Sequence, residues 1–322
     1  MDALYINREF IIKLGFEEIL DSVINAFKGY LEPGVVQPPR QELLLDDPPR
    51  FFGSMPCFLK EYNVISVKLI TYFFENPRLY GKKPFNSVVI LFSGEDGEIL
   101  AYLDGDVITT LRTAGMGVAS TKYLAPHKIE KISVIGVGVQ GRMLVEMHLR
   151  LFKSIKMVKI YNRTYSKAVE YSSYLEREFG VDSRPVDDLS KVFVDADVVM
   201  AATSSPQPVI YGRYVEPSTH IISIGYVSWD SRELDDEAVS KADNIFVDSL
   251  DAYESGDIRI PIERGVIYRD KVHLFSELIL GRVVGRREED EITIFKSVGT
   301  AVQDGYLAYR VYKKYLEGIR GR

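Results

Sequence analysis

A short apolar strand followed by closely spaced glycines is the part of this sequence with the clearest chemistry. Residues 131–141 read KISVIGVGVQG, and a helical pattern follows directly. Gly136 permits a tight turn from strand to helix, Gly138 lets backbone N–H groups approach a pyrophosphate, and Gly141 lets the new helix pack against the sheet. The first turn of that helix offers unpaired N–H groups to phosphates. The spacing predicts a dinucleotide site, and the alternative is a structural turn in another α/β sheet.

The residues after the second predicted strand indicate which dinucleotide binds. NAD sites place an Asp or Glu here, which accepts a hydrogen bond from the ribose 2′-OH. This chain has neutral Asn162, followed by Arg163 and Thr164, whose guanidinium and hydroxyl groups can hold a 2′-phosphate. The charges therefore favour NADP(H), with NAD(H) possible. The alternative is that Arg163 lies over the adenine or points into solvent, so that either cofactor is accepted.

Hydroxyl side chains follow the strand that is expected over residues 196–202. In doubly wound folds, the carboxyl ends of the parallel strands line the crevice in which ligands bind. Thr203 and Ser204 are therefore candidate neighbours of the cofactor. The alternative is a serine-rich turn that satisfies its own backbone.

Three cations outside the nucleotide-binding segment, Arg40, Lys68 and Arg112, are candidates for holding an anionic substrate. Lys68 interrupts an apolar strand, where a lysine is desolvated unless it reaches solvent or meets an anion. Arg112 lies early in a predicted helix, where a cation works against the helix dipole. Both positions are explained if the two side chains hold an incoming carboxylate. The alternative is internal ion pairing, for which the candidate partners are Asp104, Asp106 and Glu61.

The composition argues against several other classes of function. A net charge of −6 at pH 7, with no basic cluster, argues against nucleic-acid binding. Cys57 is the single cysteine and the four histidines are scattered, so we predict no disulfide and no metal site. The sequence has no apolar run of 18 residues and no basic segment before an apolar core at its start. We therefore expect a cytoplasmic protein that does not insert into membranes.

The N-terminal third reads as an α+β segment. One apolar helical face runs over residues 20–27 and is followed by Pro33-Gly34. Residues 34–56 read as a loop with two Pro-Pro pairs. Strands are then expected over 63–72, 87–92 and 98–103, before a helix over 107–124.

From residue 132 onwards, strands and helices alternate, which is typical of a parallel sheet covered on both faces. The sheet is expected to be complete by residue 248, and a C-terminal helix is expected to return to the N-terminal domain. The predicted fold class is α/β, with a doubly wound Rossmann sheet inserted into a second α+β domain. Residues 113–295 would bind NAD(P), and residues 1–112 with 296–322 would form the substrate-binding and dimerisation domain. The expected strands are 132–136, 157–161, 181–185, 196–202, 220–225 and 244–248.

Several motifs occur together in an order that is specific for one family. They are Pro39-Arg40, Met55-Pro56, Val67-Lys68, YLDG (102–105), TLRTA (110–114), GVGVQG (136–141), YNRT (161–164), ATSS (202–205), RELD (232–235), ESGD (254–257), TIFKSVG (293–299) and VQD (302–304). With these motifs the sequence resembles the ornithine cyclodeaminase/mu-crystallin family from about Leu4 to Tyr315. It resembles the ketimine reductases and archaeal-type alanine dehydrogenases of that family more than the true ornithine cyclodeaminases.

The resemblance implies a homodimer built through the N-terminal sheets, with a Rossmann domain whose cofactor faces a small amino, imino or oxo acid. It implies that Arg112 and Lys68 grip the substrate carboxylate, with Arg40 nearby. The residues implied to contact the cofactor are Gly138, Val139 and Gln140 at the pyrophosphate, Asn162, Arg163 and Thr164 at the adenosine ribose, and Val298 and Gly299 at the nicotinamide. Gly136 and Gly141 belong to the same cofactor-binding turn.

One position departs from the cyclodeaminases, which place an acid shortly after the glycine of the fifth strand. That acid handles the side-chain amine of the substrate. The matching residue here is Val227, which neither accepts a proton nor pairs with an ammonium. Asp230 could substitute only if the loop folds back. The departure argues against ornithine as the substrate.

The leading hypothesis is an NAD(P)-dependent oxidoreductase that acts on the C–N bond of a small 2-amino or 2-imino acid, as alanine dehydrogenases and ketimine reductases do. Hydride would pass between the substrate Cα and nicotinamide C4. Lys68 would transfer the proton, because a desolvated lysine has a lowered pKa. Two alternatives stay open: an ornithine cyclodeaminase that forms proline and ammonia with NAD+, or a crystallin-like protein that binds NADP(H) and a ligand without turnover.

Overall fold

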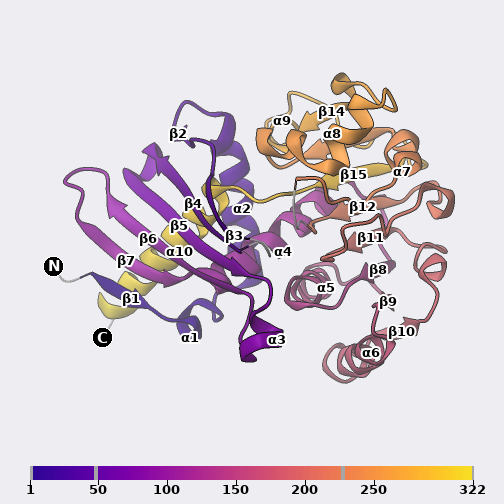
Figure 1. Cartoon of the computed structure of the whole chain (residues 1–322), viewed down its shortest axis with the longest axis horizontal. Coiled ribbons are helices and arrows are strands. Elements are labelled where there is room, and N and C mark those ends of the chain that lie inside the picture. Colours follow the sequence, from indigo (N-terminus) through magenta and orange to yellow (C-terminus); the bar gives the residue numbers. More distant parts are fainter. Residues whose placement is uncertain (1–2, 47–49, 226–228, 321–322) are drawn as a thin grey trace. The chain divides into compact units, whose positions relative to one another are not determined.

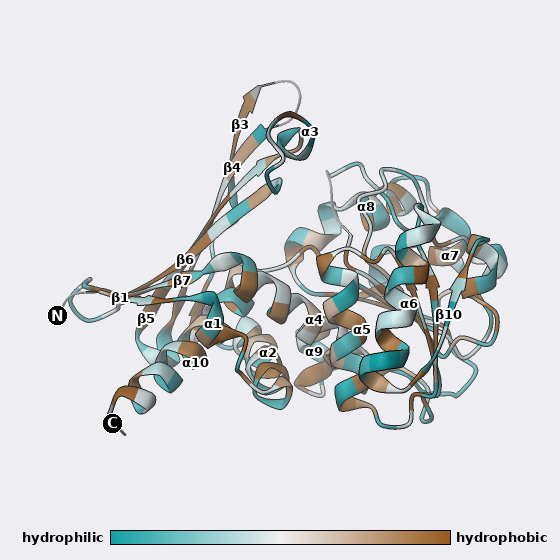
Figure 2. Cartoon of the chain, turned by 90° about the horizontal axis from the view of Figure 1, so that it is seen from below, coloured by the Kyte–Doolittle hydropathy of each residue, from teal (hydrophilic) through white to brown (hydrophobic). Residues whose placement is uncertain are grey.

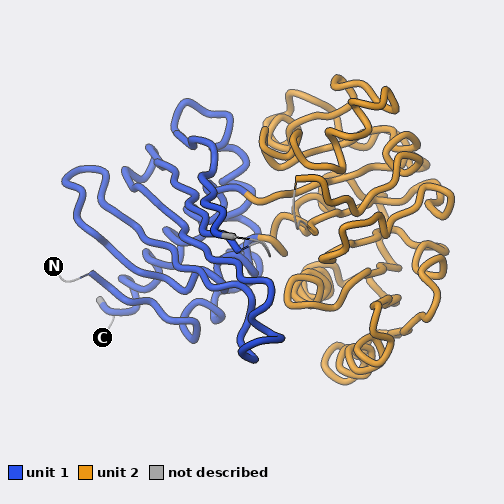
Figure 3. Tube along the Cα trace, in the orientation of Figure 1, with its two compact units in different colours: residues 1–112, 300–322 blue, residues 113–299 orange. Residues whose placement is uncertain are grey.

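The computed structural model describes residues 3–46, 50–225 and 229–320, which fold as two compact units. Unit 1 comprises residues 1–112 and 300–322, and unit 2 comprises residues 113–299 (Figure 3). The chain therefore begins in unit 1, forms unit 2, and returns to unit 1 for its last helix. The second boundary falls after Gly299 rather than after residue 295, because residues 293–296 form a strand in unit 2.

Unit 1 is built on one mostly antiparallel sheet with the strand order β1-β7-β6-β5-β4-β2, and β3 pairs with the outer part of β4 (Figure 1). The C-terminal helix α10 packs against β4, β5 and β6, and α2 packs against α10. The elements are β1 (Leu4–Ile6), α1 (Arg8–Ile11), α2 (Phe16–Leu31), β2 (Val35–Val36), β3 (Gln41–Asp46), β4 (Arg50–Leu59), β5 (Val64–Phe73), α3 (Asn76–Tyr80), β6 (Phe85–Ser93), β7 (Ile99–Asp104), the start of α4 (Gly105–Leu124) and α10 (Ala301–Arg320).

The prediction of a loop over residues 34–56 is wrong, because β3 and most of β4 lie there. Pro56 argued against a strand at this position, because proline cannot donate a backbone hydrogen bond to a neighbouring strand. In the structure Pro56 is opposite Val67 of β5. On its other side, β3 pairs with β4 only as far as Ser54 and β2 only from Phe58, so neither strand is paired with Pro56.

Unit 2 is a parallel sheet with the strand order β10-β9-β8-β11-β12-β15-β13-β14. Its central strands are buried on both faces, as a doubly wound sheet requires. The elements are β8 (Lys131–Ile135), α5 (Val139–Leu151), β9 (Met157–Tyr161), α6 (Tyr165–Phe179), β10 (Asp182–Val186), β11 (Val198–Ala201), β12 (His220–Ser223), α7 (Asp236–Lys241), β13 (Asn244–Val247), α8 (Gly256–Glu263), β14 (Val272–Leu274), α9 (Phe275–Ile279) and β15 (Thr293–Lys296). The predicted fold class is confirmed.

The expectation that this sheet is complete by residue 248 is wrong. The strand β15 lies between β12 and β13, and β14 extends the edge beyond β13. Strands of three and four residues are too short to show a periodic pattern. In addition, β15 ends in Lys296, which is only 1% exposed and reads from sequence as a surface residue.

Two neutral histidines lie in the core of unit 2, next to hydroxyl groups of α4. His148 Nε2 lies 2.8 Å from Thr121 Oγ1, and His220 Nε2 lies 3.0 Å from Ser120 Oγ. Burial lowers the pKa of His148 to about 4 and also lowers that of His220. Both rings therefore act as hydrogen-bonding core residues and stay uncharged at neutral pH. Within the described ranges, no helix is long and apolar enough to cross a membrane.

Candidate active site

The glycine-rich turn of unit 2 has an open helix N-terminus. Gly136 has φ +94°, which favours glycine, and a Cβ on Gly141 would lie 2.0 Å from the carbonyl oxygen of Gly136. Gly138 is the N-cap of α5 without a side-chain cap, and a Cβ built there meets no atom within 4 Å. Val139 is 72% exposed beside it. The two outer glycines are thus required by packing, whereas Gly138 leaves space at the helix end, as a pyrophosphate needs.

Asn162 joins this turn to the end of β9. Its Oδ1 accepts a hydrogen bond from the N–H of Val137 at 3.2 Å, and its Nδ2 donates to the carbonyl oxygen of Thr164 at 3.0 Å. The amide therefore holds two loops together, a role that the sequence did not indicate. Arg163 and Thr164 are exposed at the same place. Arg163 makes no hydrogen bond or ion pair with any other described residue, so its guanidinium is available to an anion.

Thr203 is engaged inside the protein, whereas Ser204 is exposed. The backbone N–H and Oγ1 of Thr203 both donate to Oε1 of Glu233, at 2.8 and 2.9 Å. The N–H of Ser205 donates to Thr203 Oγ1, which is the self-satisfied turn that the sequence left as an alternative. The side chain of Thr203 thus shapes the end of β11, and Ser204 is the hydroxyl left at the surface.

Glu233 is a buried carboxylate that ties together the carboxyl ends of β11 and β12. Besides Thr203, it accepts hydrogen bonds from Ser223 Oγ and from the N–H of Gly225, both at 2.8 Å. A Cβ on Gly225 would meet this carboxylate at 2.2 Å, so only glycine fits there. Sequence reasoning missed this role, although the motif at residues 232–235 contained the signal.

A buried ion pair between Lys296 and Asp257 supports the same region. Lys296 Nζ lies 2.7 Å from Asp257 Oδ2 and donates to the carbonyl oxygen of Gly225 at 2.7 Å. Asp257 Oδ1 accepts from the N–H groups of Glu233 and Leu234, each at 2.8 Å. The motifs at 232–235, 254–257 and 293–299 therefore form one polar network, which holds Gly225 and the backbone of Glu233 and Leu234 in place.

Asp248, directly after β13, holds the segment that the family resemblance assigns to the nicotinamide. Its Oδ2 accepts from Ser297 Oγ at 2.6 Å, from the N–H of Gly299 at 2.7 Å and from that of Val298 at 3.1 Å. Gly299 has φ +79°, which favours glycine. Three hydrogen bonds to one carboxylate oxygen hold this segment at the end of β13. Asp248 is a second contributor that sequence reasoning missed.

In unit 1, Lys68 and Arg112 converge on one buried carboxylate, that of Asp304. Lys68 Nζ lies 2.7 Å from Asp304 Oδ2, and Arg112 Nε lies 3.0 Å from Asp304 Oδ1. The three side chains are 2%, 6% and 1% exposed. From the sequence we predict that Lys68 and Arg112 act together, but Asp304 is not predicted as their partner. The VQD motif at 302–304 was the available signal.

The alternative partners proposed from sequence are engaged elsewhere. Asp104 accepts a hydrogen bond from the N–H of Val107, Asp106 pairs with Lys83 and Ser87, and Glu61 accepts from Tyr306. Internal ion pairing of Lys68 and Arg112 therefore occurs, but with Asp304 on α10 instead of these three carboxylates.

The electrostatics of this cluster depend on burial. The pKa of Lys68 is lowered to about 8, chiefly by desolvation and also by the positive charges of Arg112 and Arg40, while Asp304 raises it. Burial alone would raise the pKa of Asp304, but Lys68 and Arg112 together bring it below its ordinary value. The cluster therefore combines an ionised carboxylate with a lysine that titrates near physiological pH. Arg40, half-buried, acts on the same lysine through its charge.

Val227 and Asp230 are the two residues considered for the position at which the cyclodeaminases have an acid. Val227 lies outside the described residues. Asp230 is 85% exposed and pairs with Arg259 of α8, so in this structure it does not turn inward. Within the described residues, no group of three His, Cys, Asp or Glu side chains could hold a metal ion.

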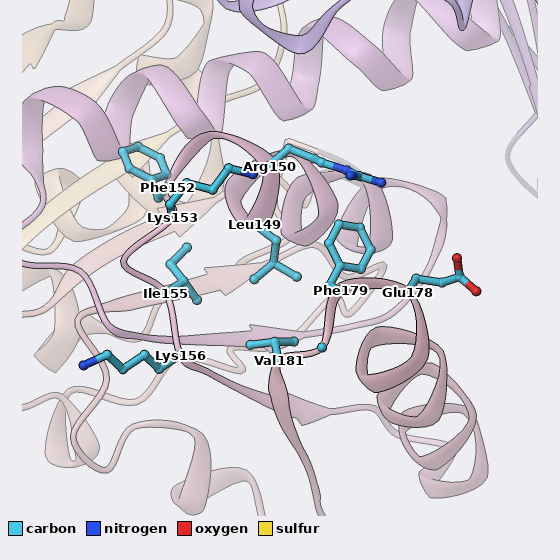
Figure 4. A pocket seen from close by; sticks show the side chains of 10 residues that line it. Leu149, Arg150, Phe152, Lys153, Ile155, Lys156, Glu178, Phe179 and Val181 are labelled. Atoms are coloured by element: carbon cyan, nitrogen blue, oxygen red, sulfur yellow. The ribbon is translucent and has the colours of Figure 1, made fainter.

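A cavity of about 480 Å³ lies elsewhere in unit 2, at the C-terminal ends of α5 and α6 (Figure 4). Leu149, Ile155 and Val181 face its interior, while Lys156 and Glu178 point outward (Figure 4). The residues that line the cavity come from the ends of α5 and α6 and from the segments just before β9 and β10, whereas the glycine turn follows the carboxyl end of β8. The cavity therefore lies at the amino end of the parallel strands, away from the glycine turn, and it is not a candidate for the active site.

Known proteins resemble this chain over almost its whole length. The sequence model of the Ornithine cyclodeaminase/mu-crystallin family matches residues 5–318. Ketimine reductase mu-crystallin of Rattus norvegicus is 31% identical over 304 residues, which cover 93% of this chain and 91% of the relative. The solved Δ1-pyrroline-2-carboxylate reductase of Thermococcus litoralis, in complex with NADH and L-proline, has a TM-score of 0.93 and 30% identity and covers 98% of both chains. An archaeal alanine dehydrogenase dimer with bound NAD has a TM-score of 0.91 and 31% identity, over 99% of this chain and 97% of that chain.

Proposed function

This chain belongs to the ornithine cyclodeaminase/mu-crystallin family, and on that premise we propose that it is an NAD(P)-dependent oxidoreductase of small 2-amino and 2-imino acids. The reaction converts a 2-imino acid, a reduced nicotinamide cofactor and a proton into a 2-amino acid and the oxidised cofactor, or runs in reverse. Relatives named above are reductases and a dehydrogenase that act on such compounds or bind them.

Unit 2 supplies the cofactor site. The uncapped first turn of α5 and the space at Gly138 fit a pyrophosphate, and the segment Val298–Gly299, fixed by Asp248, is assigned to the nicotinamide. When bound, the nicotinamide supplies or accepts the hydride at C4. The residues of unit 2 orient and hold it, and none of them needs to take part in a covalent step.

Unit 1 supplies the substrate site, and its charge balance is the observation that carries the proposal. Lys68 and Arg112 share one carboxylate, Asp304, so one buried positive charge has no counterion among the described residues of the cluster. Arg112 donates to Asp304 through Nε, and its two terminal nitrogens make no hydrogen bond with any described residue. A substrate carboxylate would neutralise the excess charge and could accept two parallel hydrogen bonds from a guanidinium.

Lys68 is the proton donor in this proposal. Reduction of a C=N bond requires a proton on nitrogen as well as a hydride on carbon. With its pKa lowered to about 8, Lys68 is protonated at neutral pH, yet it gives up its proton more easily than an exposed lysine. In the direction of amino-acid oxidation, the deprotonated Lys68 side chain would accept the proton from the substrate nitrogen.

The finer cofactor preference that we propose is for NADP(H), with NAD(H) accepted. The support is the exposed Arg163 beside a neutral Asn162 at the end of β9, where a carboxylate would exclude a 2′-phosphate. The two solved relatives above contain NADH or NAD, so the preference rests on Arg163 alone.

We further propose a homodimer built through the sheet of unit 1. Leu43, Leu44 and Leu45 on β3 are 59%, 72% and 41% exposed, and Phe52 on β4 is 37% exposed. Consecutive exposed leucines on a strand are typical of a surface that is buried against another chain. Figure 2 shows this hydrophobic hairpin reaching beyond the rest of unit 1. The related archaeal alanine dehydrogenase is a dimer.

The test is a screen for turnover. The purified protein is supplied with NADH or NADPH and with cyclic 2-imino acids of five- and six-membered rings, or with pyruvate and ammonium. We expect oxidation of the cofactor with at least one imino acid. Tight cofactor binding without turnover of any of them would favour a binding protein. Release of ammonium from ornithine without net change of cofactor would favour a cyclodeaminase.

A further inference from the structure

Asp304 is placed where it controls both cations of the substrate site. It reaches from α10 to Lys68 on β5 and Arg112 on α4, which are far apart in the sequence, and it uses a different oxygen for each. Lys68 itself lies between Met55 of β4 and Val89 of β6, which are apolar. Without Asp304, the buried ammonium of Lys68 and the buried guanidinium of Arg112 would lose the carboxylate that they share.

A purely structural role does not explain this arrangement well. Burying three charges costs more desolvation free energy than a well-packed apolar cluster of the same size. The cost is greater still when two cations share one carboxylate, because the cluster keeps a net positive charge. Such a cluster is understandable if the missing negative charge arrives with a ligand.

We propose that Asp304 is a positioning residue, which holds the Lys68 ammonium and the Arg112 guanidinium together so that both meet the substrate carboxylate and Lys68 stays protonated until it donates. The inference rests on the proposed function, because it assigns Asp304 to the substrate site of that reaction. Asp304 touches neither the cofactor nor the reacting atoms in this scheme, and it acts through the two cations.

The charges that face Lys68 define the expected pH effect. On α10 there is Asp304, on α4 there is Arg112, and ahead of β3 there is Arg40. The remaining titratable neighbour of Asp304 is Cys57 on β4, which burial keeps as a neutral thiol by raising its pKa. Asp304 is the single negative charge acting on Lys68 among these, so its removal must lower the pKa of the lysine.

The decisive variant is Asp304→Asn, which keeps the size of the side chain and removes the charge. In the direction of imine reduction, we expect the alkaline limb of the kcat/KM profile to move to lower pH by about one unit or more. Glu61→Gln is the matched control, because Glu61 is also a carboxylate of unit 1, but it bonds to Tyr306 and not to a cation of the site. Its alkaline limb should coincide with that of the unmodified protein.

A second variant, Asp304→Glu, retains the charge and displaces it by one methylene. We expect the limb to stay in place and kcat/KM to fall at least about tenfold, because the two cations lose their spacing. This variant tests the inference even if Asp304→Asn does not fold. Wild-type kinetics in Asp304→Glu, or an unmoved limb in folded Asp304→Asn, would overturn it.

Binding of pyrrole-2-carboxylate, a planar ring that carries a carboxylate, gives a readout without turnover. By calorimetry, Asp304→Asn should bind it with an affinity that begins to fall at lower pH than in the unmodified protein, as Lys68 loses its proton earlier. If the unmodified protein binds this probe but turns over no imino acid, the proposed function fails while the role of Asp304 is still measured. If turnover is present and both pH dependences are unmoved, only the role of Asp304 fails.

Discussion

Two glycine substitutions in the turn after β8 should separate cofactor binding from stability. Gly141→Ala would place a Cβ 2.0 Å from the carbonyl oxygen of Gly136, whereas ordinary contact begins at 3.4 Å. The first turn of α5 must therefore retreat by about 1.4 Å, the difference between these two distances. Gly138→Ala is different, because the new methyl group meets no protein atom within 4 Å and the backbone φ of −70° suits alanine.

The magnitudes follow from these geometries. A donor–acceptor distance of about 2.9 Å that lengthens by this amount is no longer a hydrogen bond. The loss of one or two charge-assisted bonds to phosphate costs about 3 kcal/mol, or roughly 150-fold in Kd. We expect Gly141→Ala to lose that affinity and also stability. We expect Gly138→Ala to lose at least about tenfold in affinity while its stability is unchanged or higher by about 0.5 kcal/mol.

The assays are fluorescence titration with NADH and NADPH and urea unfolding without cofactor. Gly318→Ala, in a helix of unit 1 and with no atom near the added Cβ, is the control: it should leave both affinities unchanged and raise the unfolding free energy by no more than about 1 kcal/mol. If Gly138→Ala bound both cofactors as tightly as the unmodified protein, the open helix end would not be the pyrophosphate site, and the reasoning would be refuted.

Three further predictions concern specificity, assembly and pH. Arg163→Ser should raise the KM for NADPH about tenfold and leave that for NADH unchanged, and equal effects on both would contradict the 2′-phosphate assignment. Leu44→Asp should convert dimers to monomers in light scattering, while Tyr268→Asp, an equally exposed site in unit 2, should not. Because the folded-state pKa of His148 lies near 4, below the ordinary value of 6.5, the unfolded chain takes up the proton first as the pH falls. Unfolding free energy should therefore drop by about 3 kcal/mol between pH 6.5 and pH 4, a loss that His148→Gln should reduce and that His127→Gln should not.

The parallel sheet and its glycine turn could be predicted because both depend on local pattern. Strands of buried residues alternate with helices, and the roles of Gly136 and Gly141 follow from the need for close backbone approach. The strand β15 could not be found this way, since its four residues end in a lysine whose counterion, Asp257, comes from a distant helix. From the sequence alone, Lys296 is expected at the surface, because only the folded chain brings Asp257 next to it.

The candidate site shows the same division. Lys68 and Arg112 were identifiable because each is a cation in an unfavourable local position, and the structure brings them onto one carboxylate. The partner Asp304 lay within the recognised VQD motif, but its role was not evident, because an aspartate in the first turn of a helix is ordinary. Likewise Glu233 and Asp248 act by accepting hydrogen bonds from strand ends, and such contacts leave no periodic trace in a sequence.

The central claim is that hydride moves between nicotinamide C4 and the Cα of a 2-imino acid. It is tested most directly with NADPH or NADH that carries deuterium in the transferable C4 position, a cyclic 2-imino acid, and mass spectrometry of the amino acid formed. The account predicts that the amino acid carries one deuterium, at Cα. It also predicts that Lys68→Met forms no deuterated amino acid, because it forms no product. A product without deuterium, or turnover that consumes no reduced cofactor, would contradict it.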